Sequence, residues 1–390
     1  MSKTEKMVPE LRFEEFTGAW EQRKLGEVVN ITMGQSPDSK NYTDNPNDHI
    51  LVQGNADMKD GKVFPRVWTT QVTKKANVGD LILSVRAPVG DIGKTDFSAV
   101  IGRGVASIEG NEFIFQMLSK MKSDGFWFKL STGSTFDSIN SSDIKEAMIL
   151  IPGKKEQSAI GSFFTTLDTT ITYHQRKLDK LKELKRAYLQ QMFPQNEEEV
   201  PKLRFANFNE NWEHRKLGNY FVERSERTAD GELISVTINA GVVRASTLER
   251  KDNSSKDKSN YKKVEIGDVA YNSMRMWQGA SGVSSFSGIL SPAYTVLTPG
   301  AEVSSLFFSY QFKLSKMIQI FQANSQGLTS DTWNLKYPIL KNIKTTVPIY
   351  KEQNKIGNFF KQLDYTIALH QTKLESLKEL KRAYLQKMFI

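Results

Sequence analysis

The sequence LKELKRAYLQ occupies residues 181–190 and returns, letter for letter, at residues 377–386. It is the centre of a longer repeat over 155–193 and 351–389, with the shared pattern KEQ-xx-IG-x-FF-xx-LD-x-TI-xx-HQ-x-KL-xx-LKELKRAYLQ-x-MF. Each half is also preceded by a related lead-in segment: VPELRFEEFTGAWEQRKLG starts at Val8 and VPKLRFANFNENWEHRKLG starts at Val200. The chain is therefore one module written twice: a lead-in segment, about 130 dissimilar residues and a near-identical helical segment.

The repeated segment has an apolar seam whose residues are spaced alternately by four and three. This spacing is a period of 3.5, which predicts a long helix that packs on a partner helix as in a coiled coil. No proline interrupts either copy before Pro194, so each helix should be roughly 50 Å long at about 1.5 Å per residue. The predicted seam residues are Ile160, Phe164, Leu167, Ile171, His174, Leu178, Leu181 and Tyr188, and Ile356, Phe360, Leu363, Ile367, His370, Leu374, Leu377 and Tyr384.

Two identical seams in one chain most simply pack on each other. We expect an intramolecular antiparallel coiled coil, because a pseudo-twofold relation between the halves is analogous to an isologous dimer. That arrangement would put the two variable domains at opposite ends of a rod and close the chain in a cyclic way. For His174 and His370 we favour a polar seam residue that fixes the register over a metal site, because the chain has four histidines and no cysteine.

The predicted fold class is α+β, with two similar domains joined by the two long helices. Both variable regions carry a Gly-Asp turn before a hydrophobic strand, at Gly79 and Gly267, and a Gly-x-Thr segment, at Gly133 and Gly327. We expect amphipathic helices at 112–122 and near 305–321. The predicted divisions are 1–19, an N-terminal segment near the C-terminal helix; 20–150, the first variable domain; 151–195, the first helical region; 196–211, a linker; 212–346, the second variable domain; and 347–390, the second helical region.

Composition narrows the class of protein. The 390 residues carry a net charge of +9 and a pI near 9.3, which suits a polyanionic partner such as double-stranded DNA. Cysteine is absent, which is consistent with the reducing cytoplasm. The N-terminus lacks the apolar core of a signal peptide and no apolar run is long enough to span a membrane, so we expect a cytoplasmic protein without a membrane partner.

Polar and basic residues punctuate the strands and loops of both variable regions. Arg, Asn and Gln can form paired hydrogen bonds with base edges, whereas Lys, Ser and Thr more often contact phosphates. Each residue alone is more simply a solvated or structural one, and only the two clusters favour DNA contact. The candidates are Arg86, Arg103, Lys129, Ser134, Thr135, Arg244, Asn272, Arg275, Gln278 and Thr329.

Enzyme motifs are poor. Gly93-Lys94-Thr95 ends like a phosphate-binding loop, but Pro88 stands where that motif needs glycine. Ser291-Pro292-Ala293-Tyr294 is near the motif of amine-modifying methyltransferases, yet its third letter differs and no cofactor loop accompanies it. We expect no catalytic centre, no metal site and no cofactor bound by this chain.

The arrangement resembles the specificity (S) subunit of type I restriction–modification systems. The residues that carry the likeness are Pro152 with Glu156-Gln157, Pro348 with Glu352-Gln353, the F-x-x-L-D pattern of the seam, the W-E-x-R-K-L-G lead-in and the Gly-Asp strand. The resemblance covers nearly the whole chain, from Val8 to Ile390.

The resemblance implies a fold and a function. Two target-recognition domains would each read one half of a bipartite, asymmetric DNA sequence, and the helices would set the gap between the halves. Two modification (methyltransferase) subunits with S-adenosylmethionine would dock on the chain and methylate adenine. Restriction and translocase subunits would add activity that needs ATP and Mg. The alternatives are a coiled-coil assembly scaffold without DNA contact, a stand-alone methyltransferase or nuclease, and an orphan specificity protein.

Overall fold

The computed structural model describes residues 7–131, 137–195, 198–249 and 254–390. The chain divides into two compact units. Unit 1 is Met1–Gln175 with Thr372–Ile390, and unit 2 is Arg176–Gln371. Each unit therefore contains one variable region and a part of both long helices. No helix among the described residues is long and apolar enough to cross a membrane.

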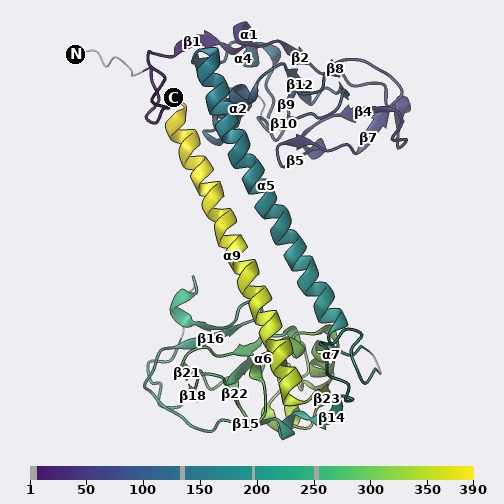
Figure 1. Cartoon of the computed structure of the whole chain (residues 1–390), viewed down its shortest axis with the longest axis vertical. Helices are drawn as coiled ribbons and strands as arrows, with labels where there is room; N and C mark the ends of the chain where they lie inside the picture. The colour runs from purple at the N-terminus through teal and green to yellow at the C-terminus, as the bar shows by residue number, and fades with distance from the viewer. Residues whose placement is uncertain (1–6, 132–136, 196–197, 250–253) are drawn as a thin grey trace, which may run out of the picture. The chain divides into compact units, whose positions relative to one another are not determined.

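The two long helices are α5 (Lys154–Gln191) and α9 (Tyr350–Met388) (Figure 1). They confirm the helices expected from the seam. Every predicted seam residue is buried or half-buried, as an apolar stripe at helical spacing requires. The start of α5 and the end of α9 belong to unit 1, and the end of α5 and the start of α9 belong to unit 2.

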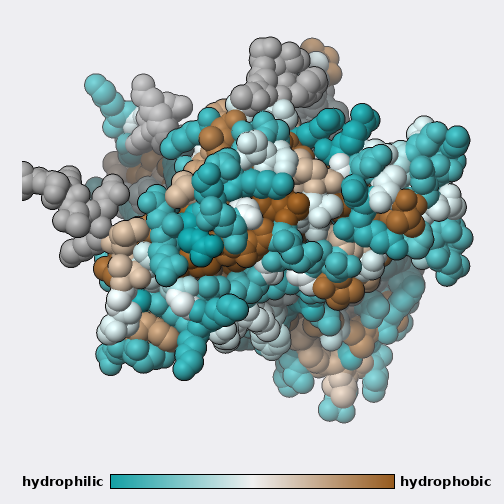
Figure 2. All heavy atoms as spheres, turned by 90° about the horizontal axis from the view of Figure 1, so that it is seen from above, coloured by the Kyte–Doolittle hydropathy of each residue, from teal (hydrophilic) through white to brown (hydrophobic). Residues whose placement is uncertain are grey.

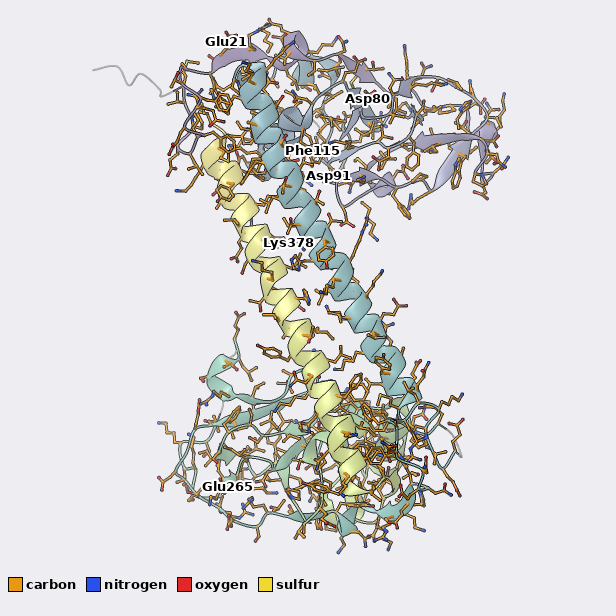
Figure 3. All side chains as sticks on the ribbon, in the orientation of Figure 1. Glu21, Asp80, Asp91, Phe115, Glu265 and Lys378 are labelled. Atoms are coloured by element: carbon orange, nitrogen blue, oxygen red, sulfur yellow. The ribbon has the colours of Figure 1, made fainter. Side chains whose placement is uncertain are left out.

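Within unit 1 the two helices run in opposite directions. The Lys381 ammonium lies 2.6 Å from the Asp168 carboxylate, and the Tyr384 and Phe163 rings meet edge to face with their centroids 4.9 Å apart. Farther along, Lys378 donates to the Gln175 side chain at 3.4 Å, where Figure 3 labels Lys378. Residue numbers rise on α5 as they fall on α9, so the pairing is antiparallel.

Unit 2 repeats these contacts with the roles of the helices exchanged. Lys185 of α5 lies 2.5 Å from Asp364 of α9. Tyr188 meets Phe359 edge to face, with the ring centroids 5.1 Å apart. The antiparallel packing expected from the repeated seam is thus present within each unit.

The variable region of unit 1 holds a six-stranded sheet in the order β2-β12-β9-β10-β6-β5 and a five-stranded sheet in the order β3-β7-β4-β11-β8. A separate pair, β1 with β13, joins the lead-in segment to the strand before α5. The strands are β1 (Glu21–Lys24), β2 (Ile31–Met33), β3 (Tyr42–Thr43), β4 (His49–Val52), β5 (Met58–Lys59), β6 (Lys62–Val63), β7 (Val67–Thr69), β8 (Lys75–Ala76), β9 (Leu81–Ser84), β10 (Ile92–Lys94), β11 (Ala99–Ile101), β12 (Val105–Ile108) and β13 (Met148–Ile151).

Unit 2 has a four-stranded sheet in the order β15-β22-β19-β20 and the pairs β16-β17, β18-β21 and β14-β23. Its strands are β14 (Glu213–Lys216), β15 (Phe221–Glu223), β16 (Ile234–Thr237), β17 (Gly241–Arg244), β18 (Lys262–Val264), β19 (Val269–Asn272), β20 (Ser281–Val283), β21 (Gly288–Leu290), β22 (Tyr294–Pro299) and β23 (Lys344–Val347).

The two variable regions share one topology. The order β15-β22-β19-β20 repeats β2-β12-β9-β10, and the pair β18-β21 repeats β8-β11. The residues of β1 and β13 pair from Glu21 with Ile151, and β14 and β23 pair in the same way from Glu213 with Val347. The expectation that the variable regions share a fold is confirmed, although unit 1 adds β6 and β5 at one sheet edge.

The shorter helices of unit 1 are α1 (Leu25–Val28), α2 (Glu112–Ser123), α3 (Phe126–Leu130) and α4 (Ser141–Lys145), and those of unit 2 are α6 (Ser305–Gln311), α7 (Ser315–Asn324) and α8 (Tyr337–Leu340). Helix α2 confirms the expected helix at 112–122. The single helix expected near 305–321 is wrong, because Leu314 takes an extended backbone and starts α7 as a new helix. The break lets Phe312 and Phe321 both lie fully buried in the core of unit 2.

The lead-in segments are fixed to the helices by one buried ion pair in each unit. Arg12 donates from Nε and Nη2 to Glu156, both at 2.7 Å. Arg204 does the same to Glu352, at 2.9 and 2.7 Å. Each bidentate bond raises the pKa of its arginine. These pairs join the first residues of each half to the start of a long helix.

The end of each long helix also lies against a lead-in segment. The backbone N–H of Leu203 donates to the carbonyl of Gln191 at 2.9 Å. In the same geometry, the N–H of Leu11 donates to the carbonyl of Lys387 at 2.9 Å. The N-terminal segment thus lies beside the end of α9 in unit 1 (Figure 1).

Aromatic side chains complete both cores at these junctions. Phe389 stacks on Phe113 in unit 1 with the ring centroids 4.9 Å apart, and Phe193 meets Phe307 in unit 2 at 5.3 Å. All four rings are buried, and burying a side chain of this size contributes roughly 1.5–3 kcal/mol. The face seen in Figure 2 is mostly hydrophilic, with some exposed hydrophobic patches.

Candidate nucleic-acid interface

The Gly-Asp turns position a buried strand in each unit. Gly79 and Gly267 have φ of +93° and +92°, a conformation that favours glycine. The N–H of Gly79 donates to the carbonyl of Thr95 at 2.8 Å, and that of Gly267 donates to the carbonyl of Ser284 at 2.9 Å. Strands β9 and β19 therefore leave equivalent turns and enter equivalent sheets.

The buried aspartates after these glycines have different partners. Asp80 accepts from the Ser107 hydroxyl at 2.7 Å, and it is labelled in Figure 3. Asp268 accepts from Nε and Nη2 of Arg224 at 2.7 and 2.9 Å, and this bond raises the pKa of Arg224. The turns are alike in backbone, while the aspartate of unit 2 binds a charged arginine and the aspartate of unit 1 accepts from an uncharged serine hydroxyl.

Each buried strand leads into a loop that meets the segment before the next short helix. In unit 1, Ile139 N–H donates to the carbonyl of Val85 at 3.0 Å. In unit 2, Leu335 N–H donates to the carbonyl of Ser273 at 2.9 Å. The structure thus brings the end of the Gly-Asp strand of each variable region beside the residues just before the next short helix, Ile139 in unit 1 and Leu335 in unit 2.

These bonds shift the correspondence between the two Gly-x-Thr segments by two residues. The sequence match pairs Asn140 with Asn334, but Asn140 is the N-cap of α4 and Lys336 is the N-cap of α8. The Gly-x-Thr segment of unit 2 is therefore two residues longer before its helix. Length differences of this kind leave the frame intact and reshape the loop, which sequence comparison of the halves could not show.

Three of the unit 1 candidates surround the loop that follows β9. Arg86 is exposed and forms an isolated bridge with Ser138. Arg103 is exposed in the turn before β12, next to Gly104, whose carbonyl accepts from Val85 N–H at 2.9 Å.

The third candidate, Lys129, lies on α3, where Trp127 packs so closely on Gly90 that a Cβ there would lie 2.5 Å from the indole. Lys129 also lines a cavity of about 270 Å³ together with Trp20 and Phe389. Ser134 and Thr135 lie outside the described residues.

Four of the unit 2 candidates come from two adjoining segments. Asn272, the last residue of β19, and Arg275 and Gln278 in the loop after it are half-buried, and the Asn272 side chain accepts from Met274 N–H at 3.0 Å. Thr329 is exposed in the segment that adjoins this loop. The loop and the segment together present amide, guanidinium and hydroxyl groups, which are base-edge and phosphate ligands.

Arg244 has a different neighbourhood. Its guanidinium forms an ion pair with Glu232 on the preceding segment and lies over the Phe286 ring, 4.8 Å from the centroid. Its charge is thus balanced within unit 2, so it is less available to a phosphate than the other arginines.

Sequence reasoning missed two further residues of the unit 2 site. Trp333 meets Trp277 edge to face, with centroids 5.2 Å apart, and Leu328 is fully exposed. The available signal was the pair of large apolar residues in the otherwise polar stretch QGLTSDTWN.

The Gly93-Lys94-Thr95 sequence does not form a phosphate-binding loop. Gly93 and Lys94 lie in strand β10. The Lys94 ammonium pairs with Glu112 and lies 5.5 Å from the centroid of the Phe115 ring, which is labelled in Figure 3. Among the described residues, no group of three or more His, Cys, Asp or Glu side chains is placed to hold a metal ion.

Comparison with known proteins finds one family in both halves of the chain. The family described as "Type I restriction modification DNA specificity domain" matches residues 18–183 and 209–379. The MjaX specificity subunit of a type I restriction enzyme from Methanocaldococcus jannaschii is 31% identical over 177 residues, 43% of this chain and 41% of the relative. The chain thus aligns with less than half the length of this curated relative.

A solved structure shows the same fold. The S subunit of a type I restriction–modification system from M. genitalium superposes with a TM-score of 0.66 over 98% of this chain and 99% of its own, at 18% identity. Because the family match covers most of the chain and occurs twice along it, this protein belongs to the type I restriction–modification DNA specificity family.

Proposed function

We propose that this chain is the DNA-reading subunit of a type I restriction–modification complex, in which each unit reads one half of a bipartite, asymmetric target. The observation that carries this proposal is the contrast within the repeat: the core strand order, the Gly-Asp turns and the ion pairs of the lead-in segments coincide, while the segments before α4 and α8 differ in length and side chains. Recognition by base-edge contacts needs such differences, so two unlike half-sites are expected.

The partners follow from the same proposal. Two modification subunits that bind S-adenosylmethionine would methylate adenine at the site, and restriction subunits would use ATP and Mg for translocation and cleavage. This chain would supply sequence recognition and a docking scaffold without a catalytic group of its own. Because a stacked adenine cannot reach an active site, the modification subunits would flip it out of the duplex.

The decisive experiment maps methylated adenines genome-wide in strains with and without this gene. The proposal expects a gapped motif with two unrelated halves that disappears with the gene. Replacing residues 20–150 by those of another family member should change one half only. If methylation is identical in both strains in the presence of the modification subunits, the proposal is wrong.

The helices supply a second test, because we propose that they fix the gap between half-sites. Inserting one heptad into both helices, after Gln175 and after Gln371, should alter the gap in the methylated motif and keep both half-sites. An unchanged gap would exclude this role of the helices while leaving sequence recognition intact.

A coiled-coil scaffold that never contacts DNA is the second candidate, and it is favoured by the antiparallel contacts of α5 and α9 alone. Salt dependence separates the two functions. Phosphate contacts release counterions, so the affinity of a DNA-reading chain should fall by roughly 10³-fold or more between 50 and 200 mM salt if about six phosphates are contacted. A scaffold would show no such binding to a duplex, with or without the target sequence.

A further inference from the structure

A short finger of unit 2, residues 326–334, presents one leucine to solvent. Its two strands are joined by Gln326 N–H to the Asn334 carbonyl at 3.0 Å and by Asn334 N–H to the Gln326 carbonyl at 2.8 Å. At its tip, Thr332 N–H donates to the Thr329 carbonyl at 2.9 Å. Leu328, next to this turn, has a relative exposure of 101%, so none of the residues that the structure describes covers it.

The finger is built to one shape. Gly327 has a φ of +148°, and a Cβ at this position would lie 2.6 Å from the Thr332 carbonyl oxygen, so only glycine fits. The Thr332 hydroxyl accepts from Thr329 N–H at 3.1 Å, and Trp333 N–H donates to the Thr329 carbonyl at 3.1 Å. These bonds fix the backbone on both sides of Leu328 before any partner binds.

The finger is also anchored to the loop that carries the polar candidates. Trp333 packs edge to face against Trp277, whose indole N–H donates to the Met274 carbonyl at 3.1 Å. The indole donor is therefore already used, and the two rings act as an apolar support for the finger. Arg275 lies beside Trp277 in the same loop, so the loop that supports the finger also carries a guanidinium group.

Folding does not account for Leu328, because a side chain that buries no surface contributes nothing to the hydrophobic core. A single exposed leucine is ordinary, but this one stands on a finger that is supported by half-buried Trp277 and Trp333, and Met274 in the same supporting loop is 40% exposed. These residues lie among amide and guanidinium side chains. Such a surface has an apolar side chain at its tip and hydrogen-bonding side chains at its border. It is complementary to duplex DNA, in which the stacked base faces are apolar and the base edges and phosphates are polar.

We propose that Leu328 inserts as a wedge between two stacked base pairs of the half-site read by unit 2. Leucine is among the side chains that proteins insert between base steps, where they unstack the bases and kink the duplex. This proposal rests on the proposed function and adds a mechanical step to it. An unstacked step within the target lowers the cost of flipping a nearby adenine, which is largest for a fully stacked base.

The test uses the full-length chain and a duplex that carries the motif found by methylation mapping. The half-site of unit 2 is the half that stays the same when residues 20–150 are exchanged. 2-Aminopurine, whose fluorescence rises on unstacking, replaces the adenines of that half one at a time. We expect binding to raise the emission at one step by about threefold or more, for the wild type and for Leu328→Met.

Leu328→Asn should bind the same motif with that rise abolished, because a polar side chain does not replace base stacking. The matched control is Ile266→Asn, since Ile266 is also on unit 2 and 71% exposed; it should keep the full signal. The proposal is overturned if the wild type binds selectively with no rise at any position, or if Leu328→Asn gives the wild-type rise.

A third outcome would also overturn the wedge. If exchange of thymine for uracil weakens binding, Leu328→Asn removes that sensitivity and the emission never changes, then Leu328 contacts a thymine methyl in the major groove instead. Failure of the proposed function gives a different result, because the wild type then selects no sequence from a random duplex pool.

Discussion

Units 1 and 2 share the contacts that join the lead-in segment to the long helices (the frame) and differ in the buried contacts of their variable sheets (the interior). At the junction of lead-in segment and helix, both units use a bidentate arginine–glutamate pair, Arg12 with Glu156 and Arg204 with Glu352. After the Gly-Asp turn, unit 2 buries an ion pair where unit 1 has Asp80 bonded to a serine. Contacts that hold the helices are thus repeated, whereas contacts within the variable sheets are free to differ.

The largest test of this comparison removes the repeated ion pair. Glu156→Gln and Glu352→Gln each leave an arginine without its charged partner. The side chains of Arg12 and Glu156 are only 15% and 4% exposed, and those of Arg204 and Glu352 are 14% and 1% exposed. Because one charge is left poorly solvated, each change should lower the free energy of unfolding by about 2–4 kcal/mol. Chemical denaturation measures this.

The matched control is Glu27→Gln, which removes an exposed pair with Arg23 and should cost less than about 0.5 kcal/mol. A loss in one unit that is several kcal/mol larger than in the other would contradict the view that the frame is equivalent in both.

The second test compares the buried aspartates of the two variable sheets, Asp268 in unit 2 and Asp80 in unit 1. Asp268→Asn leaves Arg224 buried beside a neutral amide, with only the exposed Glu226 as a second partner at 2.9 Å, so it should cost about 2–3 kcal/mol. Asp80→Asn keeps an oxygen that can accept from Ser107, so it should cost about 1 kcal/mol. Equal losses in thermal or chemical denaturation would mean that the Arg224 pair contributes nothing specific to unit 2.

The third test concerns the glycines where a short helix meets a long one. A Cβ on Gly357 would lie 2.9 Å from both Leu306 Cβ and the backbone N of Phe307, whereas a Cβ on Gly161 would lie 2.9 Å from Glu112 Cβ and 3.4 Å from the next backbone atom. Overpacking typically costs about 1–3 kcal/mol and offsets the roughly 1 kcal/mol that alanine gains in a helix.

Gly357→Ala should therefore lower the midpoint of denaturation, and Gly161→Ala should lower it less. Ser162→Ala, on the exposed side of α5, is the control and should be nearly neutral. A stabilised Gly357→Ala variant would show that α6 and α9 are not in close contact.

The long helices could be predicted from sequence because their seam is a local, periodic signal repeated in both halves. The break at Leu314 could not, because no proline or glycine marks it and the burial of Phe312 and Phe321 decides it. The candidate site was predictable in part: Asn272, Arg275 and Gln278 lie at the end of β19 and in the loop after it, so their grouping follows from sequence proximity.

The remaining site residues depend on contacts that are distant in sequence. Arg244 was grouped with the same cluster, and its pair with Glu232 only emerges when β16 and β17 are folded. Leu328 was missed because the sequence QGLTSDTWN does not show which of its two large apolar residues is exposed. Its exposure depends on the shape of the finger.

The test with the smallest expected effect exchanges charges between α5 and α9 and so examines their antiparallel pairing. Asp364→Lys places a lysine beside Lys185 in unit 2 and removes the acceptor of the Tyr310 hydroxyl, which donates to Asp364 at 2.9 Å. The pair is partly exposed, so the single change should cost about 0.5–1 kcal/mol. Lys185→Asp with Asp364→Lys should restore most of that loss but not the tyrosine hydrogen bond.

The equivalent exchange of Asp168 and Lys381 in unit 1 should behave in the same way, because those two residues face each other at 2.6 Å. In 1 M salt, where the screening length is about 3 Å, the difference in unfolding free energy between the single and double variants should shrink. If the double exchange recovers none of the lost unfolding free energy at low salt in either unit, then these lysines and aspartates do not face each other. The register of α5 against α9 would then differ from the one described.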